Sequence, residues 1–127
     1  MSQPGILVVD DNESNLKLFT LLLAGRDYEV RTARDAREAL AVLGRFHPRL
    51  MLLDIQLPDI DGLELTRRIK NDPCRRDIII VAVTAYAMRG DEDKARRAGA
   101  DGYITKPIDK RTFRRAVAEY LMERIEP

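Results

Sequence analysis

The sequence predicts an α/β fold in which a parallel sheet is covered by helices on both faces. Short apolar runs alternate five times with longer segments of helical periodicity, and such alternation builds successive β-α units. Several of the runs are continuously apolar, which is typical of strands that are buried on both faces. The chain has 127 residues, 45% of them hydrophobic, which is enough for one domain with one core.

The predicted strands end close to polar residues that can carry chemistry. The first run, "GILVVD", leads into two adjacent acids, Asp10 and Asp11, and the third, "RLMLLD", ends in Asp54. The fourth run, "DIIIVAV", is followed by Thr84, and the fifth, "GYIT", by Lys106. The predicted strands occupy residues 5–10, 28–33, 49–54, 77–83 and 102–105.

The predicted helices are bounded by ordinary start and stop signals. Asp35 is placed to cap the second helix, with Glu38 three residues later. Gly25 and Gly99 end the first and fourth helices, and Pro73 follows the third. The predicted helices occupy residues 14–24, 35–44, 63–71, 87–98 and 110–124.

The acids at the strand ends predict a metal site. Ligands bind at the carboxyl ends of the strands in this architecture, so Asp10, Asp11 and Asp54 are expected to gather at one edge of the sheet. At an effective dielectric near 20, two like charges about 4 Å apart cost about 4 kcal/mol. Either the pKa values of these acids rise or a cation lies among them. Mg²⁺, for which Mn²⁺ can substitute, prefers such oxygen ligands.

Composition argues against several other classes of protein. The 22 basic residues nearly balance the 21 acidic ones, and Trp is absent, which argues against a dedicated nucleic-acid binder. Cys74 is the single cysteine, so no disulfide can form within the chain. The start "MSQPGILVVDDN" resembles neither a signal peptide nor a membrane span. We therefore expect a cytoplasmic protein without membrane insertion.

The segments "VVDDN", "LLDIQLPDIDG", "VAVTAYA" and "GYITKP" resemble the signature segments of response regulator receiver domains of two-component signalling. The resemblance extends from residue 5 to about residue 122, and it is strongest to short single-domain regulators of the bacterial cell-cycle type. It implies a (βα)5 flavodoxin-like three-layer sandwich with a five-stranded parallel sheet in the order 2-1-3-4-5. It also implies that residues 1–127 form a single receiver domain with no output domain.

The resemblance assigns the central roles to the acids. Asp54 is implied as the phosphoacceptor, which attacks a phosphohistidine on a partner protein. Asp11 is implied as a direct Mg²⁺ ligand, Asp10 as a ligand that acts largely through water, and the backbone carbonyl of Gln56 as a further ligand. Gln56 and Tyr86 are the implied positions that tune hydrolysis of the acyl phosphate.

Other residues are implied to respond to the phosphoryl group. Lys106 would pair with Asp54 and then with a phosphoryl oxygen, and the Thr84 hydroxyl would donate to the same group. Tyr103 would be the aromatic switch that turns inward when Thr84 moves, and Pro107 would follow a cis peptide bond.

Ordinary structural roles are the alternatives for several of these residues. Thr84 suits the N-cap of the following helix, and Tyr103 suits an ordinary half-buried strand tyrosine. Asp59 and Asp61 are expected as turn residues in "LPDIDG".

The first helix predicts a docking surface. Its periodicity places Leu16, Phe19 and Leu23 on one face, which is expected to enter the core. The remaining leucines are expected outside the core: Leu18, Leu21 and Leu22. The family resemblance implies that a histidine kinase or a histidine phosphotransfer protein docks there.

The resemblance implies a signalling switch rather than an enzyme, although the domain promotes its own Mg²⁺-dependent phosphorylation and dephosphorylation. The expected output is altered binding to a downstream kinase or effector protein. The expected surface comprises the fourth helix, fifth strand and fifth helix, around Arg89, Arg96, Tyr103, Arg114 and Arg115. The alternative is a phosphate shuttle or the receiver segment of a hybrid histidine kinase.

Overall fold

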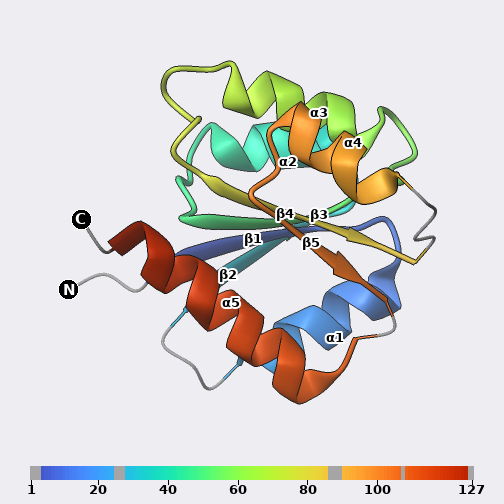
Figure 1. Ribbon diagram of the computed structural model, residues 1–127, viewed down its shortest axis with the longest axis vertical. Helices are drawn as coiled ribbons and strands as arrows, with labels where there is room; N and C mark the ends of the chain where they lie inside the picture. Colours follow the sequence, from blue (N-terminus) through green and yellow to red (C-terminus); the bar gives the residue numbers. More distant parts are fainter. Residues whose placement is uncertain (1–3, 25–27, 86–89, 107, 126–127) are drawn as a thin grey trace.

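The computed structural model confirms the predicted fold (Figure 1). It describes residues 4–24, 28–85, 90–106 and 108–125. Five parallel strands lie in the order β2-β1-β3-β4-β5. The elements are β1 (Gly5–Val9), α1 (Glu13–Leu23), β2 (Glu29–Ala33), α2 (Ala36–Leu43), β3 (Leu50–Asp54), α3 (Gly62–Lys70), β4 (Ile79–Thr84), α4 (Asp91–Ala98), β5 (Gly102–Thr105) and α5 (Lys110–Ile125).

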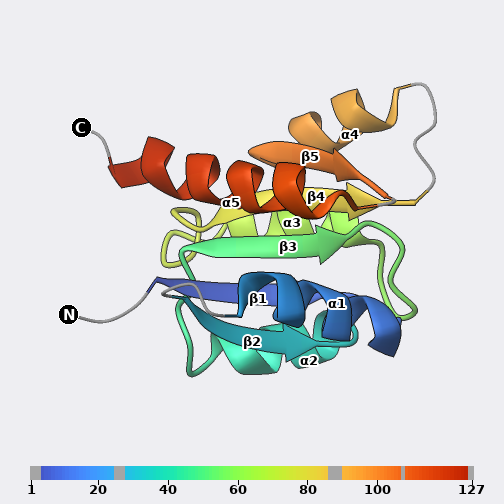
Figure 2. The ribbon, with the colours of Figure 1, turned by 90° about the horizontal axis from the view of Figure 1, so that it is seen from below.

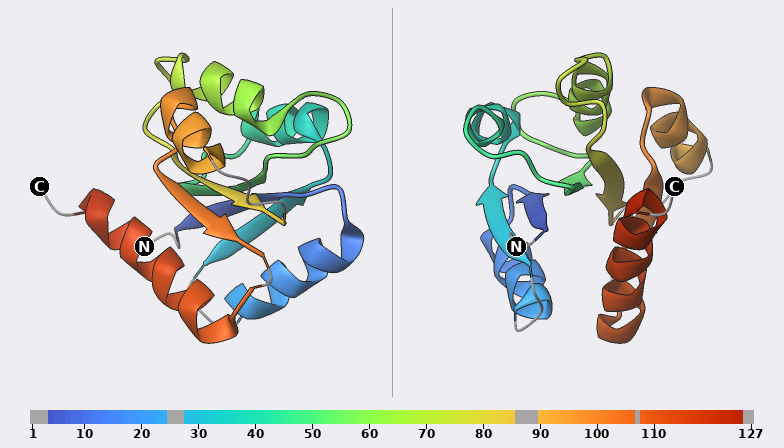
Figure 3. Two further views of the ribbon diagram at one scale, coloured as in Figure 1. Left: turned by 45° about the vertical axis from the view of Figure 1, so that its right-hand side comes forward. Right: turned by 90° about the vertical axis from the view of Figure 1, so that its left-hand side faces the viewer.

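The helices form one layer on each face of the sheet. Helices α1 and α5 cover one face, and α2, α3 and α4 lie on the other (Figures 2 and 3). None of the helices in the described part of the chain is long and apolar enough to cross a membrane.

The two layers explain the continuously apolar strands. In β1, Ile6 and Val8 pack in the cluster beneath α1 and α5, whereas Leu7 and Val9 pack in the cluster beneath α2 and α3. Successive side chains of a strand point to opposite faces, so a strand covered on both sides needs an apolar residue at every position. The edge strand β2 has solvent on its outer side and is largely exposed.

Helix α1 corrects one prediction from the sequence. Leu22 is only 1% exposed and belongs to the core with Leu16, Phe19 and Leu23, so its predicted place on the outer surface was wrong. The reason is the position of α5, whose Phe113 ring lies 5.3 Å from the Phe19 ring, measured between centroids. Leu22 and Leu23 flank Phe19 on the helix surface, and both are covered there.

Helix α4 begins at Asp91, and the predicted helical positions 87–89 lie outside the described residues. Gly90 is its N-cap, in the left-handed conformation with φ 90°. Thr84, the last residue of β4, therefore does not cap this helix.

The loop from β3 to α3 is held by contacts between acidic side chains and backbone N–H groups. Asp59 accepts hydrogen bonds from the N–H groups of Ala36 and Arg37 at 3.0 and 2.9 Å, which joins the loop to the start of α2. Asp61 caps α3 by accepting from Leu63 N at 2.8 Å. The turn roles predicted for the two acids agree with these contacts, which fix the segment that follows Asp54.

Gly62 allows α3 to start directly against the end of β3. Its N–H donates to the Ile55 carbonyl at 2.7 Å. A Cβ at this position would lie 2.7 Å from Ile55 Cα and 2.8 Å from Ile55 O, and it would also meet the Asp54 carbonyl oxygen. All three neighbours are backbone atoms, so no side-chain rotation can relieve the overlap.

We expect Gly62→Ala to lower the free energy of unfolding by about 2 kcal/mol, a typical cost of overpacking. Chemical denaturation of the purified protein measures this change. Gly44→Ala is the matched control, because Gly44 has φ −68° and a Cβ there would lie 3.3 Å from Ala41 O. Its effect should stay within about 0.5 kcal/mol. Equal stability of the two variants would contradict the backbone overlap at Gly62.

Candidate functional site

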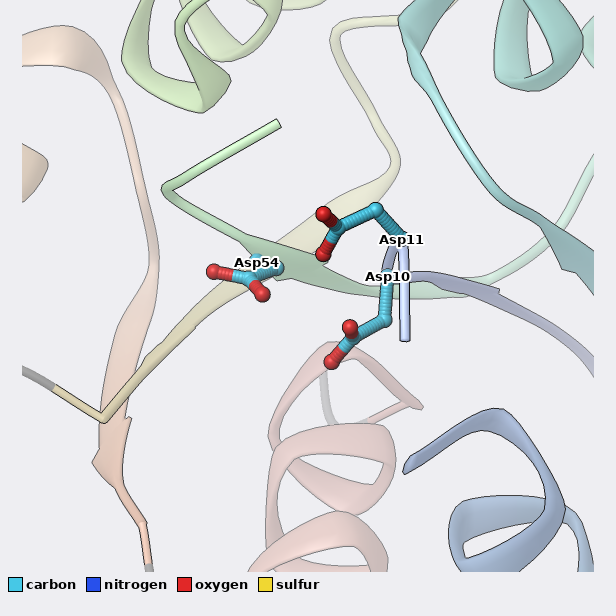
Figure 4. A group of neighbouring side chains, drawn as sticks. All are labelled: Asp10, Asp11 and Asp54. Carbon is cyan, nitrogen blue, oxygen red and sulfur yellow. The ribbon is translucent and has the colours of Figure 1, made fainter. Parts of the chain in front are cut away.

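Three carboxylates converge at the carboxyl edge of the sheet (Figure 4). Asp10 and Asp11 follow β1, Asp54 ends β3, and the preceding residues Val9 and Leu53 are partners in the sheet register. One carboxylate oxygen from each acid lies within 4.8 Å of the others. Asp10 and Asp54 are buried, and Asp11 is exposed. The structure thus brings the three predicted acids together.

Lys106 closes one side of this acidic cluster. Its ammonium nitrogen lies 2.9 Å from Asp10 Oδ2 and 3.5 Å from Asp54 Oδ2. The side chain is 13% exposed, and the Lys106 N–H donates to the Thr84 carbonyl at 2.8 Å, which fixes the loop after β5. Three carboxylates therefore face a single ammonium within the described residues of the cluster, and the site has an excess of negative charge.

Asp10 is the most completely hydrogen-bonded of the three acids. Its Oδ1 accepts from Asn12 N at 2.9 Å, and its Oδ2 accepts from Lys106. The Asn15 side-chain amide lies 3.3 Å from Oδ2 and 3.5 Å from Oδ1. These contacts hold the Asp10 carboxylate in place, so it is a fixed part of the cluster.

The contribution of Asn15 was not predicted from the sequence. Asn12 is the N-cap of α1 and accepts from Asn15 N at 3.1 Å. The spacing from Asn12 to Asn15 in "DNESN" is a recognisable capping signal. With Asn12 as the N-cap, Asn15 lies in the first turn of α1, close to the end of β1 and therefore to Asp10.

Burial raises the pKa of Asp54 above its ordinary value of 3.8. The N–H of Gln56, which donates to Asp54 Oδ1 at 2.9 Å, and the charge of Lys106 both act to lower this pKa. The charge of Asp10 raises it further. The net direction is upward, so the ionised form of Asp54 is disfavoured in the fold until positive charge is added.

The donor set suits a hard divalent cation. Mg²⁺ binds oxygen ligands at about 2.1 Å, so ligands on opposite sides of the ion lie about 4.2 Å apart. The three carboxylate oxygens, within 4.8 Å of one another, are close to this spacing. The exposed acid, Asp11, leaves one side of the cluster accessible to solvent. These residues fit a Mg²⁺ ion.

Thr84 and Tyr103 lie on the neighbouring strands. Thr84 is buried at the end of β4, one position beyond Val83, the register partner of Asp54. Tyr103 on β5 packs against Ala82 and the α4 residue Ala95. Its hydroxyl is the one buried side-chain polar atom in the described part of the chain without a hydrogen-bond partner. Burial, with smaller contributions from the charges of Asp91 and Glu92, raises the pKa of this hydroxyl above 10.0.

The described residues of the predicted output surface lie on α4, β5 and α5. Arg96 pairs with Glu92 on α4 at 3.1 Å. Arg114 and Arg115 line a hollow on the α1 side of α5, and Tyr103 lines a different hollow, between β5 and α5. A further hollow at the start of α5, lined by Asp109, Lys110, Arg111, Thr112 and Arg115, shares residues with both of these hollows. The predicted positions Tyr86, Arg89 and Pro107 lie outside the described residues.

Two of the three leucines predicted as a docking surface are exposed. Leu21 is 67% exposed and lines a shallow groove with Leu16, Lys17 and Thr32, while Leu18 is 38% exposed. Without Leu22, the apolar area on α1 is smaller than the sequence predicted.

Comparison with known proteins identifies a family. The model of the response regulator receiver domain matches residues 6–118. The polar-differentiation response regulators DivK of Brucella ovis and Brucella suis are 44% identical over 116 residues, which cover 91% of this chain and 94% of theirs. A CheY-like receiver domain protein from Methanospirillum hungatei superposes with a TM-score of 0.89 at 35% identity and 97% coverage of both chains.

The receiver domain of a sensor histidine kinase from Pseudomonas aeruginosa is also similar. It superposes with a TM-score of 0.84 at 30% identity, covering 95% of this chain and 98% of that domain. In that structure a magnesium ion is coordinated in the active site cleft.

We expect Asp54→Asn to raise the free energy of unfolding at neutral pH in the absence of divalent cations. The folded pKa of Asp54 is raised, so between 3.8 and that pKa the folded state holds more protons than the unfolded state. The stability of the wild type therefore falls as pH rises through this window. The substitution removes that loss, and its benefit should vanish below pH 3.8. Denaturation in EDTA at a series of pH values measures the difference.

Asp59→Asn is the control with the opposite sign. Burial acts to raise the pKa of Asp59, but the N–H groups of Ala36, Arg37 and Ile60 lower it to a net value below 3.8. Its ionised form stabilises the fold above pH 3.8, and this contribution is lost as pH falls through the folded pKa. The substitution should therefore destabilise the protein at neutral pH. If both substitutions changed the free energy of unfolding at neutral pH in the same direction, the opposite pKa shifts assigned to Asp54 and Asp59 would be wrong.

Proposed function

The chain belongs to the response regulator receiver domain family, and on that premise we propose that Asp54 accepts a phosphoryl group from a phosphohistidine in a Mg²⁺-dependent reaction. The donor is a histidine kinase or a histidine phosphotransfer protein. The observation that carries the proposal is the cluster itself. Asp54 lies with Asp10 and Asp11 within 4.8 Å and with the Lys106 ammonium at 3.5 Å, at the carboxyl edge of the sheet.

Asp54 is the nucleophile in this reaction. A carboxylate oxygen forms a bond to phosphorus while the P–N bond of the donor breaks, and the electron pair of that bond stays on the imidazole nitrogen. Asp54 is 8% exposed, and its Oδ1 is held by Gln56 N, so the carboxylate is already oriented. Phosphoryl transfer requires mainly positioning and electrostatic stabilisation from the protein, and this arrangement provides both.

The residues that would hold Mg²⁺ are Asp10, Asp11, Asp54 and the backbone carbonyl of Gln56, with Asp10 acting largely through water. Mn²⁺ is expected to substitute. The bound ion would neutralise carboxylate charge and stabilise the charge that develops on the phosphoryl oxygens. The Gln56 peptide lies at the cluster, because its N–H contacts Asp54. The magnesium ion in the related Pseudomonas aeruginosa domain supports this assignment.

Lys106 and Thr84 would stabilise the phosphorylated form. The Lys106 ammonium, which now contacts both Asp10 and Asp54, would pair with a phosphoryl oxygen. Thr84, at the end of the adjacent strand, would donate its hydroxyl to the same group. Gln56 is a position at which side-chain identity would tune the later hydrolysis by water.

Tyr103 would change its conformation when Asp54 is phosphorylated, and this would alter the surface next to α4. Its buried hydroxyl lacks a hydrogen-bond partner within the described residues, and its ring packs on Ala82 beside α4. A buried hydroxyl without a hydrogen-bond partner raises the free energy of the conformation that contains it. A movement of the neighbouring segment that gave this hydroxyl a partner or exposed it to water would therefore shift the balance between conformations. Tyr103 is therefore suited to act as the switch residue.

The proposed output is altered protein–protein interaction. The DivK relatives are polar-differentiation response regulators, and the match covers 94% of their length, which supports a single-domain regulator of that kind. The upstream kinase or phosphotransfer protein would dock near Leu18 and Leu21 on α1. A downstream kinase or effector would bind near Tyr103 and Arg96.

A second candidate is a phosphate shuttle or the receiver segment of a hybrid histidine kinase. The match to the receiver domain of the Pseudomonas aeruginosa sensor kinase favours it. Transfer from phosphorylated Asp54 back to a histidine phosphotransfer protein separates the two functions. Rapid and complete reverse transfer supports a shuttle, and a stable phosphorylated form that binds an effector supports the switch.

We expect Asp54→Asn to abolish phosphorylation, because the amide is not a nucleophile for this transfer. The assay uses phosphoramidate, whose P–N bond resembles that of phosphohistidine, and a panel of labelled histidine kinases, each with Mg²⁺ or EDTA. Intact mass spectrometry and label retention detect the product. Lys106→Ala should slow the reaction at least about tenfold through lost charge stabilisation. Asp77→Asn, an exposed acid outside the cluster, should be labelled like the wild type, and label retained on Asp54→Asn would place the acceptor elsewhere.

We expect Mg²⁺ to stabilise the protein against unfolding, by about 2.7 kcal/mol at a concentration 100 times its dissociation constant. Thermal unfolding at increasing Mg²⁺ concentration measures this. Asp11→Asn should weaken the effect without disturbing the core, because Asp11 is exposed. Asp77→Asn, an exposed acid that contacts His47, is the matched control and should keep the full effect. An unchanged response of Asp11→Asn would remove this residue from the metal site.

A further inference from the structure

A basic hollow lies between the C-terminal end of α1 and the first half of α5, away from the acidic cluster. Its volume is about 560 Å³, and four cations line it: Lys110, Arg111, Arg114 and Arg115. The remaining lining residues are Leu23, Tyr28 and Ala118, so no described carboxylate lines the hollow. We propose that this basic hollow binds a small molecule that carries two or more phosphate groups. The proposal does not depend on phosphorylation of Asp54.

The four cations of the basic hollow are not neutralised by acids in the described part of the chain. Most ion pairs of the described residues join an arginine to a nearby acid, as Arg67 and Arg68 join Glu64 on α3. No ion pair between described residues involves any of the four. Their positive charge is therefore available to a ligand.

The spacing of these residues concentrates the charge. Lys110 and Arg114 are four residues apart, as are Arg111 and Arg115, and like charges at this spacing destabilise a helix. Lys110 and Arg111 also lie in the first turn of α5, where the helix dipole disfavours cations. The first turn of α5 contains no acid. The preceding Asp109 supplies one negative charge, and its carboxylate is used to accept from Thr112 N at 3.0 Å. A multiply charged anion would relieve this repulsion.

Arg114 makes the hollow partly pre-organised. Its Nε donates to the carbonyl of Leu22 at 2.8 Å, which joins α5 to the end of α1 (Figure 3, left). A guanidinium has five N–H donors in a planar fork, and this contact uses one of them. Part of the entropy of ordering a long side chain is thus already lost before a ligand binds.

The chemistry of the lining indicates the class of ligand. Guanidinium groups bind phosphate through paired, charge-assisted hydrogen bonds, and several cations in one hollow match several phosphates. The volume lies within the range of small-molecule sites, and Tyr28 and Leu23 add an apolar wall. The acidic cluster of Asp10, Asp11 and Asp54 repels the same ligand when no cation is bound, so the two sites can be tested separately.

The test is calorimetric titration of the full chain with inorganic tripolyphosphate, ATP and adenosine, at low ionic strength with EDTA. Tripolyphosphate and ATP should bind saturably, and adenosine should not. Amide chemical shifts of Tyr28 and Ala118 should move, because both residues line the hollow. Equal affinity for tripolyphosphate and ATP would show that the phosphates alone are recognised. Binding of ATP tenfold tighter than that of tripolyphosphate would indicate that the base and sugar are contacted as well.

The double substitution Arg111→Ala/Arg115→Ala should weaken binding at least tenfold, and both side chains are exposed, so the fold should survive. The matched control is Arg67→Ala/Arg68→Ala, which removes the same charge from α3 and should bind like the wild type. Absence of saturable binding by tripolyphosphate and ATP would overturn the proposal. Equal weakening of binding in both double variants would also overturn it, because it would indicate long-range attraction by net charge. Binding of adenosine as tight as that of ATP would overturn it as well.

Discussion

The structure depends on a conflict of like charges that the fold itself creates. Parallel strands end at a common edge, and β1 and β3 lead directly into carboxylates there, so the sheet register brings Asp10, Asp11 and Asp54 together. Hydrogen bonds from Asn12, Asn15 and Gln56, and one ammonium from Lys106, compensate only part of the charge. The remaining negative charge suits the site to a cation, and burial, with a smaller contribution from the charge of Asp10, raises the pKa of Asp54.

The rest of the molecule keeps this arrangement rigid. Every residue of β1, β3 and β4 is buried, and the apolar runs of β3 and β4 give way to a polar residue only at their last positions, Asp54 and Thr84. Gly62 allows α3 to begin against the backbone of Asp54 and Ile55, and Asp59 joins the intervening loop to α2. Packing thus positions the carboxylates, and the positions of the carboxylates determine the chemistry.

Features set by periodicity and strand ends were predictable from the sequence, and features set by helix crossing were not. The fold and the convergence of Asp10, Asp11 and Asp54 follow from apolar runs that stop at acids. The burial of Leu22 depends on where α5 crosses α1, and one helix viewed alone does not contain that information. The same crossing places the Arg114 guanidinium against the Leu22 carbonyl.

In the proposed function, Lys106 is the residue through which charge added at Asp54 would change the conformation. The ammonium lies closer to Asp10 Oδ2, at 2.9 Å, than to Asp54 Oδ2, at 3.5 Å. A phosphoryl group on Asp54 would add negative charge on that side and favour contacts there, while Asp10 keeps the contacts from Asn12 and Asn15. Since Lys106 N is bonded to the Thr84 carbonyl, any shift of the lysine backbone is transmitted to β4. A switch requires such an interaction that differs between two states, and in the proposed function Lys106 would supply it.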